Sequence, residues 1–168
     1  MARTSRSSTP IISLARFGLA ALALAMAATA VAQPGGGAVE TFRVVTVVEG
    51  LVNPWSIAFL PNGDLLVTER PGRLRIVRNG RLLPNAVPGV PAVRATGQGG
   101  LQDVVLHPNF ASNQVLYLSY AKGNADNSLG TTALTRARLV NDRLVDIEEI
   151  FEAKAWNDRP GHFGARIA

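Results

Sequence analysis

Short apolar segments separated by turn residues make up the chain beyond its first fifty positions. Residues 55–59 (WSIAF) form an apolar run, residues 65–68 (LLVT) form the next, and residues 74–77 alternate apolar and polar side chains. The residues between these segments are rich in Pro, Gly, Asn and Asp, which favour turns. Residues 79–80 (Asn-Gly) have the sequence typical of a type I′ hairpin turn. Beyond residue 32 no stretch keeps a helical period of 3.6, so the pattern predicts an all-β protein.

The order of these turn sequences recurs once along the chain. Residues 59–62 (FLPN) are echoed 47 positions later by residues 106–109 (LHPN), and residues 79–82 (NGRL) are echoed by residues 141–144 (NDRL). The extra residues of the second copy fall in loops, where insertions are best tolerated. Each copy therefore holds about four short strands in roughly 50–60 residues, somewhat longer than the ~40–50 residues typical of a propeller blade repeat.

Four-stranded units repeated in this way predict a β-propeller, of which the chain would supply two blades and the start of a third. A β-sandwich is the alternative, because it also uses regular short strands. Residues 167–168 (IA) resemble residues 57–58, where the first innermost strand runs. Because two blades do not close a ring, we expect the chain to be an N-terminal fragment. Alone it would expose apolar blade faces and an unpaired strand edge, and would be unstable or prone to aggregate.

The first 32 residues have the features of a secretory signal peptide. Residues 1–16 carry three arginines and no acid, residues 17–31 are almost wholly apolar, and residues 30–32 (AVA) match a cleavage site. A membrane anchor is the alternative, but fifteen helical residues reach only about 22 Å, short of a hydrocarbon core of about 30 Å. We therefore expect cleavage after Ala32, a periplasmic or secreted protein, and no membrane span after cleavage.

Removal of this leader changes the organisation and the charge of what remains. Residues 33–41 predict a flexible lead-in, and residues 42–168 the propeller part. The formal charge of +5 falls to +2 when the three leader arginines leave. Scattered arginines and so small a charge do not indicate a nucleic-acid partner. The absence of cysteine excludes thiol catalysis and cysteine-based metal sites.

Two glycine-flanked loops provide the best candidates for a site. Gln98 lies in residues 97–100 (GQGG), and His162 lies 64 positions later in residues 161–164 (GHFG). Each loop precedes an innermost strand, and equivalent loops of a propeller converge around its axis. Two polar side chains at one axial mouth indicate a ligand site. The alternative is that both loops are only tight turns.

His162 is the candidate acid–base residue, because an ordinary imidazole titrates near neutral pH. His107 stands before a proline at a strand end, and we interpret it as structural. Asp103 and Asp158 flank the two loops and could orient a histidine, although most such acids are surface or turn residues. The sequence contains no phosphate-binding loop, helical metal motif or serine nucleophile elbow.

At these residues the chain resembles a known family. Residues 53–72, 97–101, 107–110 and 161–166 together look like the soluble quinoprotein glucose/sorbosone dehydrogenases, and most like the bacterial periplasmic aldose sugar dehydrogenases that use pyrroloquinoline quinone (PQQ). The resemblance extends over residues 44–168. Its motifs are specific as a set, although each alone would be weak.

The resemblance implies a six-bladed propeller that oxidises aldose sugars at C1 to the lactone. The cofactor PQQ would take the hydride, and the protein would orient the reactants. His162 stands where the family has its general base, and Gln98 stands where a family glutamine hydrogen-bonds PQQ. An electron acceptor of unknown identity would reoxidise the cofactor.

The same resemblance implies that parts of the site are missing. The family's calcium ligands and its cationic contacts to PQQ come from later blades, so this chain supplies no metal ligand. A cofactor with three carboxylates should bind poorly without these cations. We therefore expect little or no dehydrogenase activity from the chain alone.

Two positions near His162 bear on how closely the chain follows the family pattern. Ala165 replaces a glycine common in the family, and a positive φ there would cost about 1 kcal/mol. Arg166 matches the family, but we assign it no catalytic role.

Two other classes of function remain open from the residues. One is a non-catalytic propeller that binds a ligand or a protein. The other is a propeller hydrolase such as a sugar lactonase, which would need metal-binding carboxylates along the axis. The axial candidates Gln98 and His162 do not meet that need.

Overall fold

The computed structural model describes residues 42–168, and residues 45–168 form one compact unit. The predicted signal peptide (1–32) and lead-in (33–41) lie outside the described residues. Within residues 42–168, no helix is long and apolar enough to cross a membrane.

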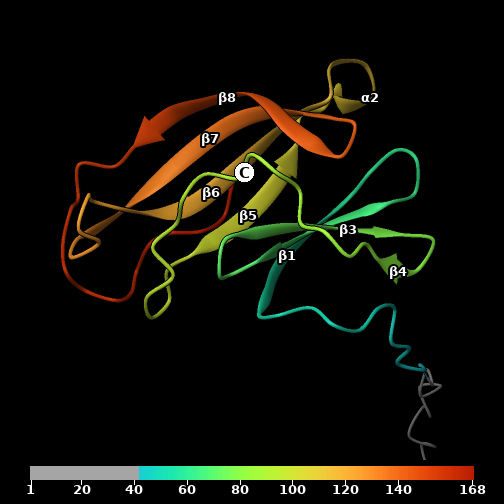
Figure 1. Ribbon diagram of the computed structural model, residues 1–168, viewed down its shortest axis with the longest axis horizontal. Coiled ribbons are helices and arrows are strands. Elements are labelled where there is room, and N and C mark those ends of the chain that lie inside the picture. Colours follow the sequence, from blue (N-terminus) through green and yellow to red (C-terminus); the bar gives the residue numbers. More distant parts are fainter. Residues whose placement is uncertain (1–41) are drawn as a thin grey trace, which may run out of the picture. The chain divides into compact units, whose positions relative to one another are not determined.

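The compact unit contains two four-stranded antiparallel sheets (Figure 1), as the sequence predicts. The first sheet consists of β1 (Pro54–Phe59), β2 (Leu65–Glu69), β3 (Arg73–Arg78) and β4 (Arg81–Leu82). The second consists of β5 (Leu101–Leu106), β6 (Val115–Gly123), β7 (Gly130–Val140) and β8 (Arg143–Glu152). In both sheets the spatial order of the strands follows the chain, so each sheet is a simple meander. Consecutive meanders are the arrangement of propeller blades, whereas sandwiches commonly use Greek-key connections.

The last hairpin of each sheet turns in the same way. Asn79 and Gly80 join β3 to β4 with φ of 52° and 73°, and Asn141 and Asp142 join β7 to β8 with φ of 50° and 58°. Two consecutive positive φ values define a type I′ turn, whose twist matches that of the strands it joins. The prediction at Asn79–Gly80 is confirmed, and the second copy keeps the geometry although Asp142 replaces the glycine.

The loop between β5 and β6 contains a feature that the sequence pattern did not predict. A single helical turn, α2 (Phe110–Asn113), occupies the insertion expected as a loop. It ends at Gln114, whose φ of 57° places it in the left-handed region. The buried Phe110 anchors this turn against the core.

The two sheets pack face to face and share one hydrophobic core. Alternation along each strand directs every second side chain to this interface. The core residues of the two sheets are Ala58, Leu66, Leu74 and Ile76 from the first and Leu101, Val104, Leu116, Leu118, Tyr120, Ala133, Ala137, Leu139 and Leu144 from the second. This shared core fixes the position of the loop that precedes β5, which carries Gln98, relative to the first sheet.

The outer face of β1 remains apolar and exposed. Trp55, Ile57 and Phe59 alternate with residues that face the core and are 46%, 49% and 72% exposed. They line an apolar groove of about 340 Å³ together with Val47 and Leu51. The repeat pattern predicted that such a blade face would be exposed, and the structure confirms it.

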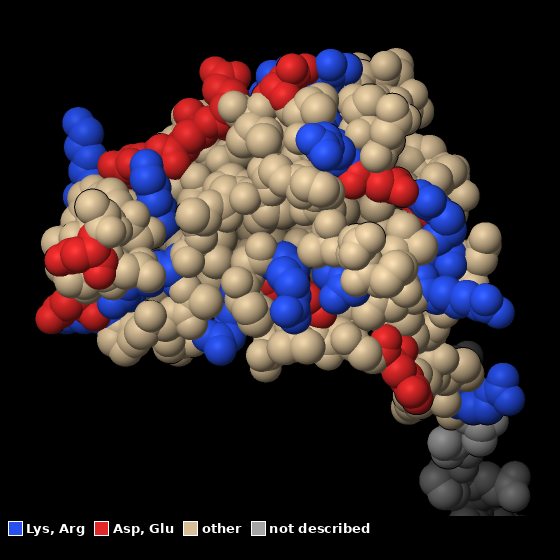
Figure 2. Space-filling model, in the orientation of Figure 1, with Lys and Arg blue, Asp and Glu red and all other residues tan. Residues whose placement is uncertain are grey.

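Charged side chains on the face shown in Figure 2 are interspersed rather than segregated. Acidic residues follow β8 along one edge, with basic residues beside them. Lys122 bridges Glu149 and Glu152 at 2.7 and 2.6 Å, and Arg138 pairs with Asp146 at 2.7 Å.

Candidate functional site

The structure brings Gln98 and His162 together at one end of the two sheets. The backbone N–H of Gln98 donates to the carbonyl of Pro160 at 2.7 Å, and the backbone N–H of His162 donates to Gln98 Oε1 at 3.2 Å. Both residues are exposed at a pocket of about 400 Å³, whose lining is Gly97, Gln98, Arg159, Pro160, Gly161 and His162. The two loops predicted to converge therefore meet, although they lie 64 positions apart in the chain.

The side chain of His162 is exposed at this pocket. Its imidazole makes no hydrogen bond to any side chain or backbone group of residues 42–168. Its backbone has φ of 67°, an uncommon left-handed conformation for a residue other than glycine. Since such strain concentrates at functional sites, this backbone supports a role for His162 in the pocket.

The amide of Gln98 has a fixed direction. A backbone N–H needs an acceptor, so the side-chain oxygen of Gln98 must face His162. The amide NH₂ is then left to donate to a ligand in the pocket.

Arg159 contributes a positive charge to the same lining. Its guanidinium is exposed and forms no ion pair with any acid of residues 42–168. The backbone N–H of Arg159 donates to Asn157 Oδ1 at 3.0 Å, which fixes the local turn. Sequence reasoning missed Arg159, because nothing local distinguishes it from other surface arginines.

A second arginine, Arg94, lies buried behind these loops. Its guanidinium donates to the backbone carbonyls of Asn127 at 3.1 Å, Ser128 at 3.3 Å and Asp158 at 3.4 Å. No carboxylate pairs with it within the described residues, and its Nη1 atom has no hydrogen-bond partner there. Arg94 thus joins the β6–β7 loop to the segment before His162, a function that its sequence position did not reveal.

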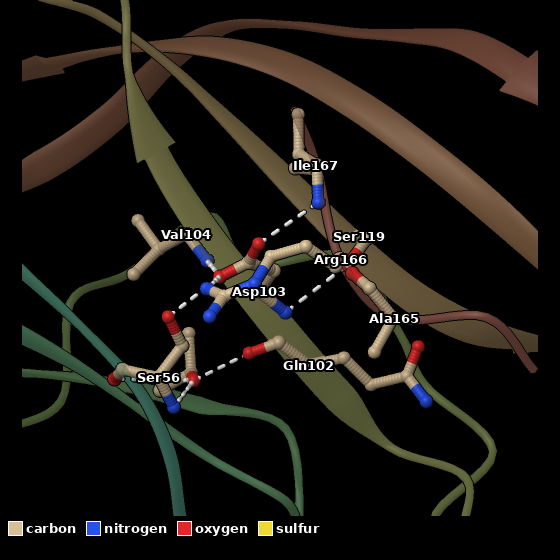
Figure 3. A network of polar contacts seen from close by, with 9 residues as sticks. Ser56, Gln102, Asp103, Val104, Ser119, Ala165, Arg166 and Ile167 are labelled. Atoms are coloured by element: carbon tan, nitrogen blue, oxygen red, sulfur yellow. Dashed lines mark hydrogen bonds and ion pairs between the residues drawn. The ribbon is translucent and has the colours of Figure 1, made fainter.

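Asp103, a candidate for orienting a histidine, has a different role in the structure (Figure 3). Its buried carboxylate accepts hydrogen bonds from Ser56 Oγ at 2.6 Å and from the backbone N–H of Ile167 at 2.9 Å. It makes no contact with His162. Asp103 therefore joins β1 to the segment that follows His162.

Asp158 does not orient His162 either. It is exposed, and its contribution is the backbone carbonyl that accepts from Arg94. Within residues 42–168, neither carboxylate forms a hydrogen bond or an ion pair with the imidazole of His162.

Ser56 and Asp103 line a separate pocket of about 180 Å³ with Trp55, Ala165 and Arg166. Sequence reasoning missed this pair, although the two residues are 47 positions apart, the same shift that relates the FLPN and LHPN segments.

The alternative of a metal-dependent hydrolase would need several carboxylates close together. Within residues 42–168, no three His, Cys, Asp or Glu side chains gather closely enough to hold a metal ion.

His107 lies at the opposite end of β5 from Gln98. Its Nδ1 accepts the backbone N–H of Asn109 at 3.0 Å and lies 3.0 Å from the side-chain nitrogen of Asn113. Its ring lies 6.4 Å from that of Tyr117. These contacts hold the turn around α2, which agrees with the structural role predicted for His107.

The strain considered at Ala165 does not occur. The positive φ values of this loop fall on His162 at 67° and Gly164 at 54°, and Ala165 has none. Arg166 is 82% exposed, and its guanidinium lies 3.7 Å from Asp103.

The two successive four-stranded meanders define the class of fold as a β-propeller, of which the chain supplies part. The family model described as Glucose / Sorbosone dehydrogenase matches residues 51–168. The chain belongs to this glucose/sorbosone dehydrogenase family.

Relatives and solved structures support this membership. The aldose sugar dehydrogenase YliI of Escherichia coli K12 is 39% identical over 130 residues, and an uncharacterized Synechocystis protein, slr1608, is 44% identical over 133 residues. These matches cover 76% and 74% of this chain but 35% and 32% of the relatives, so the chain spans about a third of their length.

The solved structures agree with these matches. The apo soluble aldose sugar dehydrogenase of E. coli is 40% identical with a TM-score of 0.65, covering 70% of this chain and 35% of that one. The PQQ-bound aldose sugar dehydrogenase of Streptomyces coelicolor is 27% identical with a TM-score of 0.57, covering 66% and 33%.

Proposed function

We propose that this chain contributes part of the active site of a PQQ-dependent dehydrogenase that oxidises aldose sugars at C1 to the lactone. The observation that carries the proposal is the meeting of Gln98 and His162 in one pocket, joined by the 3.2 Å hydrogen bond between them. Family membership supports the reaction class, and the PQQ-bound form of the Streptomyces relative supports the cofactor.

The residues of the pocket fit a planar, polyanionic cofactor. The free NH₂ of Gln98 is a hydrogen-bond donor, and the unpaired guanidinium of Arg159 suits a carboxylate. The volume of about 400 Å³ is in the range of small-molecule sites. Gln98 and Arg159 would hold the cofactor, which when bound supplies an oxidant able to accept a hydride.

His162 would act as the general base in this reaction. Its imidazole would remove the proton of the C1 hydroxyl while the C1 hydride leaves for the oxidant, so the sugar loses two electrons and two hydrogens and becomes the lactone. Because His162 is exposed, it could then return the proton to solvent. Its left-handed backbone would set the direction from which the ring approaches the sugar.

Residues 42–168 supply only part of the positive charge that a cofactor with three carboxylates needs. Arg159 is one guanidinium, and residues 42–168 hold no cluster suited to calcium. Calcium stays an implication of the family resemblance, and no step of the proposed reaction depends on it. We therefore expect PQQ to bind weakly to this chain and turnover to be very slow.

The cellular setting is part of the same proposal. We propose a periplasmic or secreted protein, on the basis of the predicted leader and of a solved relative described as soluble. The acceptor that removes electrons from the cofactor is a separate partner whose identity no described residue indicates.

Two experiments test the proposal. In a full-length relative such as the E. coli aldose sugar dehydrogenase, the change equivalent to His162→Ala should lower kcat for dye reduction with an aldose by about a hundredfold or more, the usual contribution of a positioned base. In the 168-residue chain, PQQ binding followed by quenching of tryptophan fluorescence should weaken in Gln98→Met and Arg159→Met.

The matched control is His107→Ala, because His107 lies at the other end of β5 and outside the pocket. Full dye reduction by the His162→Ala equivalent would reject the general base. Another group would then have to remove the proton of the C1 hydroxyl.

A further inference from the structure

Gln98 joins two successive blades at two points. Its backbone N–H donates to Pro160 O at 2.7 Å, and its side-chain oxygen accepts the N–H of His162 at 3.2 Å. One residue of the first loop thus holds both ends of the short segment 160–162. The segment between these bonds contains the residue proposed as the base.

The second of these bonds acts on a strained residue. His162 has φ of 67°, a conformation that costs a residue with a β-carbon roughly 1 kcal/mol. Such a conformation persists only where its surroundings hold it. Within residues 42–168, the backbone N–H of His162 donates only to Gln98 Oε1.

Gly161 provides the space for this contact. A β-carbon at residue 161 would lie 2.9 Å from Gln98 Oε1 and 3.3 Å from Gln98 Cδ. The backbone of Gly161 does not have a positive φ, so alanine is compatible with its conformation. The glycine therefore leaves room for the Gln98 amide, and a β-carbon there would push the Gln98 oxygen away.

We infer that Gln98 is a positioning residue for His162: its side-chain oxygen holds the left-handed backbone that presents the imidazole, while its NH₂ remains free for the ligand. This inference deepens the proposed function, since the catalytic part of it rests on His162 as the base. The hydrogen bond itself does not depend on that function, so the two can fail separately.

The test is the hydrogen exchange of the His162 amide in the 168-residue chain, without cofactor. In Gln98→Met, which has a similar shape and no acceptor, the His162 amide should exchange about fivefold faster, as expected for the loss of one exposed hydrogen bond. Gln98→Glu keeps an acceptor oxygen and loses the NH₂, so it should retain the protection of the wild type. In Gly161→Ala, which keeps Gln98, the His162 amide should exchange as fast as in Gln98→Met, because the added β-carbon displaces the Gln98 oxygen.

The amides of β6 report whether each variant is folded, and their exchange should be unchanged because Gln98 is exposed. Unchanged protection of His162 in Gln98→Met would overturn the inference, and so would a Gln98→Glu variant as unprotected as Gln98→Met. In the full-length relative, the Gln98→Glu equivalent should weaken PQQ affinity but keep kcat at saturating PQQ, whereas the Gln98→Met equivalent should lower both. An unchanged kcat at saturating PQQ in the Gln98→Met equivalent would mean that Gln98 acts only on the ligand.

If no aldose oxidation is found while the exchange pattern holds, the proposed function fails and the positioning role stands. If oxidation is found while the exchange pattern fails, His162 is held by other contacts and the positioning role falls.

Discussion

Arg78 on β3 and Asp142 in the β7–β8 turn form a two-point ion pair between successive blades. The Nη1–Oδ2 and Nη2–Oδ1 distances are 3.1 and 2.9 Å. The same guanidinium donates from Nε to Asp64 Oδ2 at 2.8 Å, and Asp64 is almost fully buried. The hydrogen bonds to Asp142 and then to Asp64 raise the pKa of Arg78, so it stays charged throughout the working range.

The two partners of Arg78 should differ in their importance for stability. Arg78→Met leaves the buried Asp64 carboxylate without its cation, whereas Asp142→Asn removes only an exposed partner. We expect Arg78→Met to lower the thermal midpoint clearly and Asp142→Asn to change it little. The measurement is thermal unfolding followed by circular dichroism. Equal losses in the two variants would show that the contact between blades matters more than the burial of Asp64.

Glu69 should make stability depend on pH. Its buried carboxylate accepts from the N–H of Val52 at 2.6 Å and from Arg73 Nε at 2.5 Å. Burial raises the pKa of Glu69, but the hydrogen bonds from Val52 and Arg73, with the charges of Arg73 and Arg75, outweigh it and hold the pKa below 4.5. The stabilisation is therefore complete above pH 4.5 and is lost as pH falls through the folded-state pKa.

Glu69→Gln tests this dependence. At pH 7 it should lower the free energy of unfolding by about 2 kcal/mol, the scale of charge-assisted hydrogen bonds. The difference from the wild type should shrink as pH falls below 4.5 and the wild-type carboxylate becomes protonated. Urea unfolding at pH 7 and at acid pH measures it. A difference that is the same at both would mean that the charge of Glu69 contributes nothing.

Tyr120 should ionise well above the usual range. Desolvation by burial, together with the neighbouring Glu149, raises the pKa of Tyr120 to about 12, and its hydroxyl donates to Glu149 Oε2 at 2.8 Å. Tyr117→Phe leaves Tyr120 as the only tyrosine. In that variant the phenolate absorbance, recorded by stopped-flow pH jumps before alkaline unfolding, should rise with a midpoint near 12. A native-state midpoint near the ordinary value of about 10 would show that the ring is not desolvated.

Gly164 should resist substitution for conformational reasons alone. Its φ is 54°, and an added β-carbon would find nothing within 4 Å. Gly164→Ala should therefore cost about 1 kcal/mol through backbone strain. Ala165→Gly is the control, because Ala165 has no positive φ and should gain no strain relief. The two variants can be compared by urea unfolding, and a neutral Gly164→Ala would mean that the loop adapts.

The apolar outer face of β1 should cause self-association. Ile57→Thr with Phe59→Thr removes two exposed apolar side chains while leaving the core-facing Ala58 in place. We expect the double variant to bind less of the dye ANS and to remain monomeric to a severalfold higher concentration by light scattering. Ile150→Thr on β8 is the control, since that side chain lies outside the β1 groove. An equal effect of the control would indicate that no particular face drives association.

The fold could be predicted where local signals agree with one another. Apolar runs bounded by turn residues placed β1, β2 and β3 closely, and the Asn79–Gly80 turn followed from its residue types. The helical turn α2 was missed because Phe110–Asn113 is too short to show a period. Its formation depends on burying Phe110 in a core that the local sequence does not contain.

The sequence alone determined the strand pattern, the repeat and the equivalence of the positions of Gln98 and His162. These features follow from the types and spacing of neighbouring residues, which a sequence shows directly. The tertiary structure decided that Asp103 binds Ser56 and Ile167, that Arg94 is buried among carbonyls, and that the Gln98 oxygen faces the His162 N–H. These contacts join residues 33 to 64 positions apart. They exist only after the two sheets bury their shared core, which sets the distance between the loops they carry.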